Sequence, residues 1–337
     1  MKNFWTMSLP LNKTGCLYRP KKGSGGRLDV KVEDTRVCGW PAIRRSCGDL
    51  SVGIVPSAGG RIMSLVFAGL ELLFSPPAFP LEVPCANADL RSFKRRTGFL
   101  LPGGSKVWPA PEKEWWEGMP PVDLDRAPFS VVEDAESVVL TSPVCRETGL
   151  RVTRRISFLE YNRLGVTEIF ENAGNVPVNK GLWTVTQVPR PFDVYFPCST
   201  QCIRSYHTHD STLPDPGQQA ETCGAWSHLP VHSGVCFKFG AWYSPGAVLL
   251  LKKSAQGMIS FLKSFPVDIS RSYAHSSVVE VFNSASAPYG ELEIHSPVQS
   301  LLPGERAVFS QKWYFSRYSA HTPLDTILQR NFSVFAG

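Results

Sequence analysis

From Trp40 onward, apolar and polar residues alternate along most of the chain with a period of two. This is the period of a β-strand, in which successive side chains point to opposite faces. Turn-forming Gly, Pro, Asn and Ser separate the alternating segments, which indicates antiparallel strands joined by short connections. The predicted strands cover residues 50–56, 61–67, 69–74, 138–142, 150–159, 164–171, 182–188, 235–239, 247–252, 258–263, 278–283, 291–295 and 307–315.

Helical patterns are few, and the clearest predicts one or two turns over residues 322–330. Strands do not alternate with helices, so a nucleotide-binding α/β fold is disfavoured. The paired glycines at 59–60 and 103–104 also lack the remaining spacing of a phosphate-binding fingerprint. Two long stretches, 76–128 and 198–231, are predicted to be loops, and long loops in a compact β domain are often functional.

The first 36 residues are rich in Lys, Gly and Pro without a sustained period. They are predicted to form a flexible N-terminal arm, and residues 37–337 a single domain. A length of 337 residues is compatible with one large all-β domain.

Composition and charge exclude nucleic acid and membranes as expected partners of this chain. The chain is 43% hydrophobic and 19% charged, which is globular rather than disordered. The net charge of +6 comes from short basic clusters outside any nucleic-acid motif, so no nucleic acid is expected. No apolar run approaches the roughly 20 residues of a membrane span, so no membrane is expected either. Nine cysteines without an export signal predict reduced thiols and a cytoplasmic location.

The segment from Tyr289 to Pro297 carries the most informative chemistry. As a strand, it places Glu291, Glu293 and His295 on one face and apolar side chains on the other. The polar face is either solvated surface or the floor of a cleft that binds a polyhydroxylated ligand and moves its protons. In a cleft, adjacent carboxylates would raise one another's pKa, which suits a general base.

Several strings in order extend this interpretation. They are 59–64 with 69–73, Gly103-Gly-Ser-Lys-Val-Trp-Pro-Ala-Pro-Glu112, 172–187, and Val279-Glu-Val-Phe282 leading into 289–293 and 303–305. Their order resembles the galactose mutarotase-like (aldose 1-epimerase-like) family, in particular an uncharacterised branch, over about residues 48–315. The resemblance implies an all-β fold, a large antiparallel β-supersandwich with few short helices, whose concave sheet holds a small carbohydrate.

The resemblance also implies an isomerase reaction on sugar anomers, without metal or organic cofactor. A carboxylate takes the anomeric proton while an imidazole protonates the ring oxygen. The family's catalytic glutamate falls on Glu293, with Glu291 the nearby alternative. Pro102 stands where the family has one histidine, and strand 181–187 lacks the other. These departures leave open whether the chain is an enzyme, in which His295 or a histidine of the 207–232 segment would substitute as the acid.

Six further residues are candidates for sugar binding. Lys106, Trp108 and Glu112 follow the second glycine pair, and Trp108 offers a flat face and an N–H donor. Trp183 and Gln187 share a strand face, and Gln187 both donates and accepts. Arg61 follows the first glycine pair, and surface exposure is the more common fate of such an arginine. The alternative for the tryptophans is to plug a loop onto the core, which is expected of Trp115 and Trp116.

Three other functions remain open. One is a non-enzymatic carbohydrate-recognition module, and another is a glycoside hydrolase or lyase accessory fold. The third is an interaction protein stabilised by metal through the 198–232 segment. That segment holds a Cys/His cluster whose spacing matches no standard zinc finger, so no metal site is predicted: Cys198, Cys202, His207, His209, Cys223, His228 and His232. The oligomeric state does not follow from the sequence.

Overall fold

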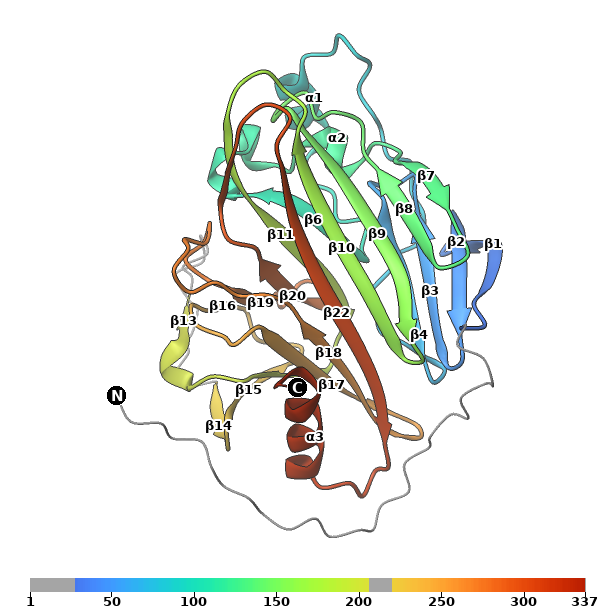
Figure 1. Ribbon diagram of the computed structural model, residues 1–337, viewed down its shortest axis with the longest axis vertical. Coiled ribbons are helices and arrows are strands. Elements are labelled where there is room, and N and C mark those ends of the chain that lie inside the picture. The colour runs from blue at the N-terminus through green and yellow to red at the C-terminus, as the bar shows by residue number, and fades with distance from the viewer. Residues whose placement is uncertain (1–27, 206–219, 337) are drawn as a thin grey trace.

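Two antiparallel β-sheets make up most of the computed structural model, which describes residues 28–205 and 220–336 (Figure 1). The predicted all-β class and β-sandwich architecture are confirmed. In Figure 1 the long strands β9, β10 and β22 of one sheet lie in front of β6, β11 and β20 of the other. The prediction of a single domain over 37–337 stays a prediction.

Within the described residues, the first sheet has 12 strands. Its order is β1 (Lys31–Val37), β2 (Trp40–Cys47), β3 (Leu50–Val55), β4 (Arg61–Phe67), β6 (Ser105–Ala110), β11 (Val178–Pro189), β20 (Tyr289–His295), β19 (Val279–Asn283), β16 (Phe237–Ala241) and β13 (Ile203–Ser205). Two short strands complete it, β5 (Leu70–Glu71) beside β4 and β21 (Gln299–Leu301) beside β11.

The second sheet has 10 strands within the same residues. Its order is β14 (Glu221–Cys223), β15 (Trp226–Val231), β12 (Phe192–Phe196), β17 (Ala247–Ser254), β18 (Gly257–Ser264), β22 (Arg306–Tyr318), β10 (Arg163–Asn172), β9 (Leu150–Glu160), β8 (Ser137–Thr141) and β7 (Ser130–Glu133).

The main core lies between the two sheets. Leu164 and Val166 of β10 share one apolar cluster with Leu182 and Val188 of β11, and all four are at most 1% exposed. Burying each such side chain stabilises the fold by about 1.5–3 kcal/mol. Because the other face of β11 points away from this core, its residues are available to build a site.

The predicted loop 76–128 contains short helices that the sequence analysis did not identify. The longest is α1 (Leu90–Thr97), which begins at Asp89, whose carboxylate accepts from the backbone N–H groups of Arg91 and Ser92. Only Leu90 and Phe93 supply an apolar anchor for its two turns, so the periodicity is too short to detect. The others are α2 (Val122–Asp125) and the 3₁₀ turns η1 (Glu112–Glu114) and η2 (Trp116–Gly118).

The C-terminal helix is longer than predicted. Helix α3 (Leu324–Ala336) places Ile327 and Leu328 against Tyr195 and Leu249 on the outer face of the second sheet. No helix in the described part of the chain is long and apolar enough to cross a membrane.

The N-terminal segment differs in part from the predicted arm. Residues 31–36 lie in β1, which pairs with β2 along its whole length. This part of the arm is therefore a strand of the sheet. Residues 1–27 lie outside the described residues.

Candidate functional site

The face of the first sheet opposite the core carries charged and aromatic side chains, and we call it the site face. Lys106 of β6 is opposite Val185 of β11, which is opposite Glu293 of β20, which is opposite Glu280 of β19. A second row runs through Trp108, Trp183 and His295. In full, the site face comprises Lys106, Trp108, Trp183, Val185, Gln187, Lys238, Glu280, Glu291, Glu293 and His295.

Alternation along each strand produces this face. Leu292 and Ile294 enter the main core, so Glu291, Glu293 and His295 point the other way, as the sequence predicts.

A glycine pair precedes β6 and allows it to lie close to β4. Gly103 and Gly104 have φ of 92° and 72°, and a Cβ on Gly104 would lie 2.4 Å from the Ile62 carbonyl oxygen. Only glycine allows β6 to approach β4 this closely.

Glu293 is at the centre of the site face and is fully buried. Its Oε2 accepts from Trp183 Nε1 at 2.8 Å and lies 3.2 Å from Lys238 Nζ. Burial raises the pKa of Glu293 well above its ordinary value, Lys238 opposes this, and the carboxylates of Glu280 and Glu291 add to the increase. Burial, more than the neighbouring carboxylates, is thus the main cause of this increase.

Lys238 links Glu293 to a second carboxylate. Its Nζ is 3.1 Å from Glu280 Oε2, and its side chain is 14% exposed. Burial lowers the pKa of Lys238, but the charges of Glu293, Glu280 and Glu112 outweigh burial and raise it above its ordinary value. The lysine is thus a permanent cation between two carboxylates.

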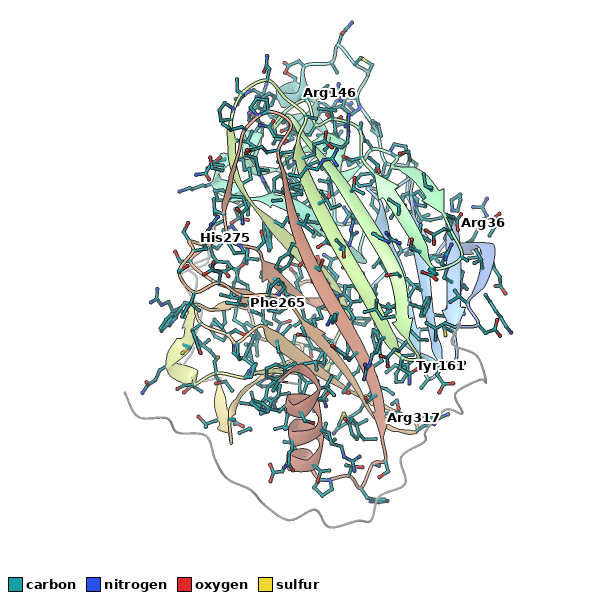
Figure 2. The ribbon with its side chains drawn as sticks, viewed as in Figure 1. Arg36, Arg146, Tyr161, Phe265, His275 and Arg317 are labelled. Atoms are coloured by element: carbon teal, nitrogen blue, oxygen red, sulfur yellow. The ribbon has the colours of Figure 1, made fainter. Side chains whose placement is uncertain are left out.

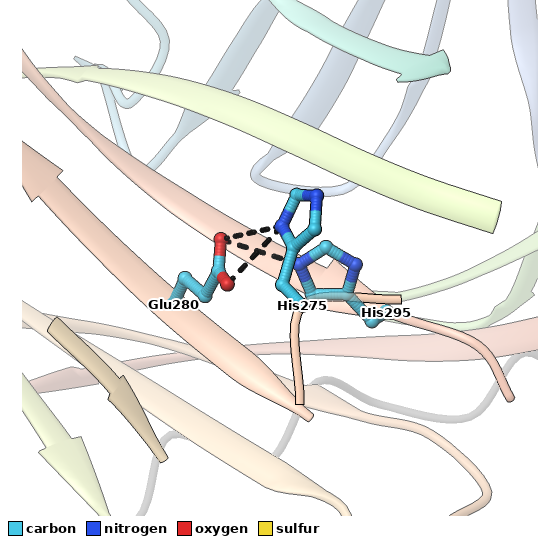
Figure 3. A group of neighbouring side chains, drawn as sticks. All are labelled: His275, Glu280 and His295. Carbon is cyan, nitrogen blue, oxygen red and sulfur yellow. Dashed lines mark hydrogen bonds and ion pairs between the residues drawn. The ribbon is translucent and has the colours of Figure 1, made fainter. Parts of the chain in front are cut away.

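The Glu280 carboxylate faces two neighbouring imidazoles (Figure 3). Its Oε1 is 3.2 Å from Nδ1 of His275, and its Oε2 is 3.3 Å from Nε2 of His295. Burial raises the pKa of Glu280, but the charge of His295, followed by that of Lys238, outweighs burial and brings it well below its ordinary value. Burial lowers the pKa of His295 in turn, against the pull of Glu280.

His275 reaches the site face from outside the sheet. It lies in the loop between β18 and β19, at the edge of the molecule in Figure 2. Its ring centroid is 4.8 Å from that of Trp183 and 4.6 Å from that of His295. Two imidazoles and an indole therefore meet beside Glu280.

Arg61 occupies the other end of the site face, and the expectation of surface exposure was wrong. It is fully buried, with Nη2 2.5 Å from Oδ1 of Asp125, which also accepts from Trp108 Nε1 at 2.8 Å. Asp125 ends α2, so the loop 76–128 supplies the counter-charge that allows a buried arginine. Burial nonetheless lowers the pKa of Arg61.

Lys106 lies beside this group with its Nζ 3.9 Å from the centroid of the Trp108 ring. Burial lowers its pKa to about 8, while the charge of Glu291 opposes the decrease. Glu291 is half-buried and accepts from Gln187 Nε2 at 2.6 Å. Of the predicted binding residues, Glu112 alone is exposed, and it lies in η1 at the rim of the site face, near Lys238.

The structure brings together every predicted site residue, but not around an open cleft. Trp115 covers the centre, because its ring stacks on Trp183 at 5.5 Å and its Nε1 donates to the Pro109 carbonyl at 2.8 Å. Trp108 and Trp183 are each only 3% exposed. The prediction that Trp115 plugs a loop onto the protein agrees with this geometry, and the plugged surface is the site face itself.

Sequence reasoning missed four residues of this site: Asp125, Lys238, His275 and Glu280. Lys238 and Glu280 had a detectable signal, because each is a single charge between apolar strand residues, in Phe237-Lys-Phe239 and Val279-Glu-Val281. A charge at such a position faces away from the core and lies in line with its neighbours across the sheet. Asp125 and His275 lie outside strands and had no such signal.

The Cys/His cluster predicted over 198–232 is only partly described. His207 and His209 lie outside the described residues. Cys198 precedes η3 (Thr200–Cys202) and Cys202 ends it, whereas Cys223 and His228 lie on β14 and β15 of the second sheet. His228 contacts Asp193 Oδ1 at 2.8 Å and so belongs to a different polar group.

A groove of about 360 Å³ lies away from the site face. Its lining comes from β12, β15 and β17 of the second sheet and includes Asp193, His232 and Lys252. None of the predicted sugar-binding residues lines it.

Comparisons with known proteins give a likeness in structure but not in sequence. No protein-family model matches the chain, and no curated protein matches it. Among solved structures, a candidate aldose 1-epimerase from Klebsiella pneumoniae superposes with a TM-score of 0.57 at 12% identity, covering 89% of this chain and 84% of that one. A galactose mutarotase-like protein from Lactobacillus casei gives 0.53 at 11% identity, covering 82% and 100%. The chain has the galactose mutarotase-like fold.

The same fold occurs within a larger protein. A TPR-domain containing protein from Parabacteroides distasonis matches with a TM-score of 0.53 at 13% identity, over 84% of this chain and 48% of its own length. This chain therefore spans about half of that relative. At such identities the comparisons establish the galactose mutarotase-like fold and leave the chemistry to the residues of the site face.

Proposed function

We propose that the chain is a carbohydrate-binding protein of the mutarotase type, in which Glu293 takes the proton of the anomeric hydroxyl. The observation that supports this most directly is the mixture of buried donors and acceptors without a hydrogen-bond partner among the described residues. The donors are Lys106 Nζ and Arg61 Nε and Nη1, and the acceptors are the Oε1 atoms of Gln187, Glu280 and Glu293.

A sugar ring matches this mixture. Each hydroxyl group donates one hydrogen bond and accepts others, so neighbouring hydroxyls satisfy donors and acceptors in turn. Leaving such groups buried and unpaired costs about 1–3 kcal/mol each, which favours a ligand that pairs them. The indoles of Trp108, Trp115 and Trp183 add flat apolar surfaces suited to the C–H face of a sugar.

The imidazole implied by the family resemblance has a replacement in the tertiary structure. Trp183 is on the strand where the family has a histidine, and His295 is its direct partner on β20, with the two rings stacked at 5.6 Å. His275 approaches the same indole from the loop. Either imidazole is a candidate for the proton donor to the ring oxygen.

Entry of a sugar requires movement of the segment that carries Trp115. This segment, residues 112–118, is joined to its surroundings by ion pairs, between Lys180 and Glu114 and between Arg95 and Glu117 at 2.9 Å. Such partly exposed pairs are weak, so the main polar cost of opening is the hydrogen bond from the buried Lys94 Nζ to the Trp116 carbonyl at 3.2 Å. Loss of the Trp115–Trp183 contact is compensated when a sugar takes its place.

The test combines binding and turnover with a panel of aldoses, including glucose, galactose and mannose. Binding is followed through tryptophan fluorescence, since three indoles line the site, and anomer exchange through polarimetry. E293Q is expected to keep binding and to lose about 10²–10⁴-fold in exchange rate, the usual contribution of one proton-transfer group. E136Q, in an exposed turn, is the matched control and is expected to match the wild type in both assays.

Melting curves establish that E293Q is folded, and W183F serves as a second variant that removes the N–H donated to Glu293 and keeps an aromatic ring at that position. Failure of every sugar in the panel to bind would overturn the proposal. Binding without accelerated exchange would favour the second candidate, a carbohydrate-recognition module. The absence of a histidine at position 102 and on strand 181–187 supports that candidate, because the indole of Trp183 stacks on sugars but transfers no protons.

A further inference from the structure

We propose that His275, Glu280 and His295 form a binding site for one divalent transition-metal ion of the zinc class. The three residues come from the loop before β19, from β19 and from β20, and their ligand atoms all lie within 4.8 Å of one another (Figure 3). This inference concerns a second ligand of the site face and stands independently of sugar binding.

The separations suit a tetrahedral ion. Ligand atoms about 2.0–2.1 Å from a tetrahedral metal are about 3.3–3.4 Å apart. Glu280 Oε1 is 3.2 Å from His275 Nδ1, which matches this separation, and His295 Nε2 is 3.3 Å from the other oxygen, Oε2, with all the ligand atoms within 4.8 Å of one another. Two imidazole nitrogens and one carboxylate oxygen leave a fourth position open, which is the arrangement of catalytic rather than structural zinc sites.

His295 supplies a second, independent observation. It is fully buried, and neither of its ring nitrogens makes a geometrically acceptable hydrogen bond within the described residues. Its approach to Glu280 is close but lacks the alignment of a hydrogen bond. A buried imidazole normally has a partner for at least one of its nitrogens. A metal ion bound to the lone pair of a His295 nitrogen would supply that partner.

Lys238 occupies one side of Glu280 and leaves the other available. Its Nζ lies 3.1 Å from Oε2, whereas Oε1 accepts no hydrogen bond within the described residues. Oε1 can therefore bind the ion while Oε2 stays paired with the ammonium group. Carboxylate ligands commonly have their second oxygen held in this way, which fixes their orientation.

The nitrogen-rich ligand set selects the class of metal. Imidazole suits zinc, cobalt, nickel and copper, whereas magnesium and calcium require oxygen ligands almost exclusively. Cobalt(II) is the useful probe, because its visible absorption distinguishes tetrahedral nitrogen and oxygen ligation from binding to thiolates. This distinction matters because the described residues include 8 free cysteines.

The experiment uses the full chain, stripped with a chelator and titrated with Co²⁺ and then with Zn²⁺. One equivalent of Co²⁺ is expected to give a tetrahedral spectrum without a thiolate charge-transfer band, and Zn²⁺ is expected to displace it. H275A is the main variant, because His275 is at the edge of the site and its removal leaves the buried groups in place. It is expected to lower the affinity at least tenfold, as is E280Q.

H321A, which removes an exposed histidine outside the cluster, is the matched control and is expected to bind as the wild type does. Absence of a tetrahedral spectrum, a thiolate band in its place, or equal affinity in H275A and the wild type would each overturn the proposal. Sugar binding by the metal-free protein is measured separately, so failure here leaves the carbohydrate proposal untouched. Because a bound ion occupies the imidazole lone pairs, Zn²⁺ is expected to slow any anomer exchange that uses an imidazole acid.

Discussion

Individual charged residues, more than the strands that carry them, determine the character of the site face. Arg61 and Asp125 illustrate this, since each is at most 3% exposed and each neutralises the other. A buried charge that keeps its partner is tolerated, whereas one that loses it is strongly destabilising.

At this scale we predict that D125N lowers the free energy of unfolding by about 3–5 kcal/mol. The asparagine keeps the shape of the side chain and an acceptor for Trp108, but it leaves the Arg61 cation unpaired. Urea denaturation followed by circular dichroism measures the change. The control is E82Q, which breaks an Arg–carboxylate pair with Arg96 whose members are 60% and 56% exposed, and it is expected to have almost no effect. Equal effects of the two variants would contradict this account.

The position of a residue on its strand explains which residues of the site could be predicted from the sequence. Glu291, Glu293 and His295 share one strand, so their common face follows from the alternation alone. Their burial does not follow, because an exposed strand face and a covered one have the same alternation. Covering depends on Trp115, which is distant in sequence from β20.

At the scale of elements, the pairing of β12 with β15 brings together a second polar group, His228 and Asp193, on the second sheet. His228 of β15 is opposite Tyr195 of β12, with stacked rings 4.7 Å apart, and its Nε2 lies 2.8 Å from Asp193 Oδ1. Burial lowers the pKa of His228, but the hydrogen bond and charge of Asp193, with those of Glu221, raise it above its ordinary value. When protonated, the imidazole therefore adds an ion pair between β12 and β15, which already pair through their backbones.

This pair predicts a pH-dependent contribution to stability. The folded-state pKa is raised, so the contribution is fully present below the unfolded value of about 6.5 and is lost as the pH rises through the folded value. H228Q is expected to lose about 1 kcal/mol at about pH 5 and almost nothing at about pH 9, since Asp193 is 37% exposed and water screens the pair. Urea denaturation at both pH values checks this, with H321Q as the control. A deficit that grows with pH would contradict the sign.

Among the elements, the strands were the most predictable and the short helices the least. Strands β9, β10 and β22 match the predicted segments closely, because long alternation with buried residues on one side is a strong signal. Strand β6 was assigned to a loop, since Pro109 interrupts its pattern. The segment 76–128 nevertheless contributes Trp108, Trp115 and Asp125 to the candidate site.

On the scale of the whole molecule, a buried ionic group joins the two sheets through their main core. Arg154 of β9 lies 3.1 Å from Glu168 of β10, and Arg154 Nη1 donates across to the carbonyls of Gly60 and Ser105 at 2.9 and 3.0 Å. Lys263 of β18 donates to the Thr186 hydroxyl of β11. Burial lowers the pKa of Lys263 to about 7, and the charge of Glu168 opposes this decrease.

We predict that E168Q destabilises the protein by about 3–5 kcal/mol, because the buried Arg154 cation then has no anion. K263M, alone and combined with E168Q, tests whether the charge of Glu168 also stabilises Lys263 across the core. A double-mutant cycle by urea denaturation measures the coupling between the two positions. Simple additivity of the two changes would show that Lys263 does not depend on Glu168.

The sequence by itself determined the all-β class, most strand positions and the common face of Glu291, Glu293 and His295. These follow from a period of two, which is a local property that neighbouring residues impose on one another. The tertiary structure alone decided that Lys238, Glu280, His275 and Asp125 join that face and that Trp115 closes it. Such meetings depend on the register between distant strands and on the path of loops, and alternation within a single strand carries no record of either.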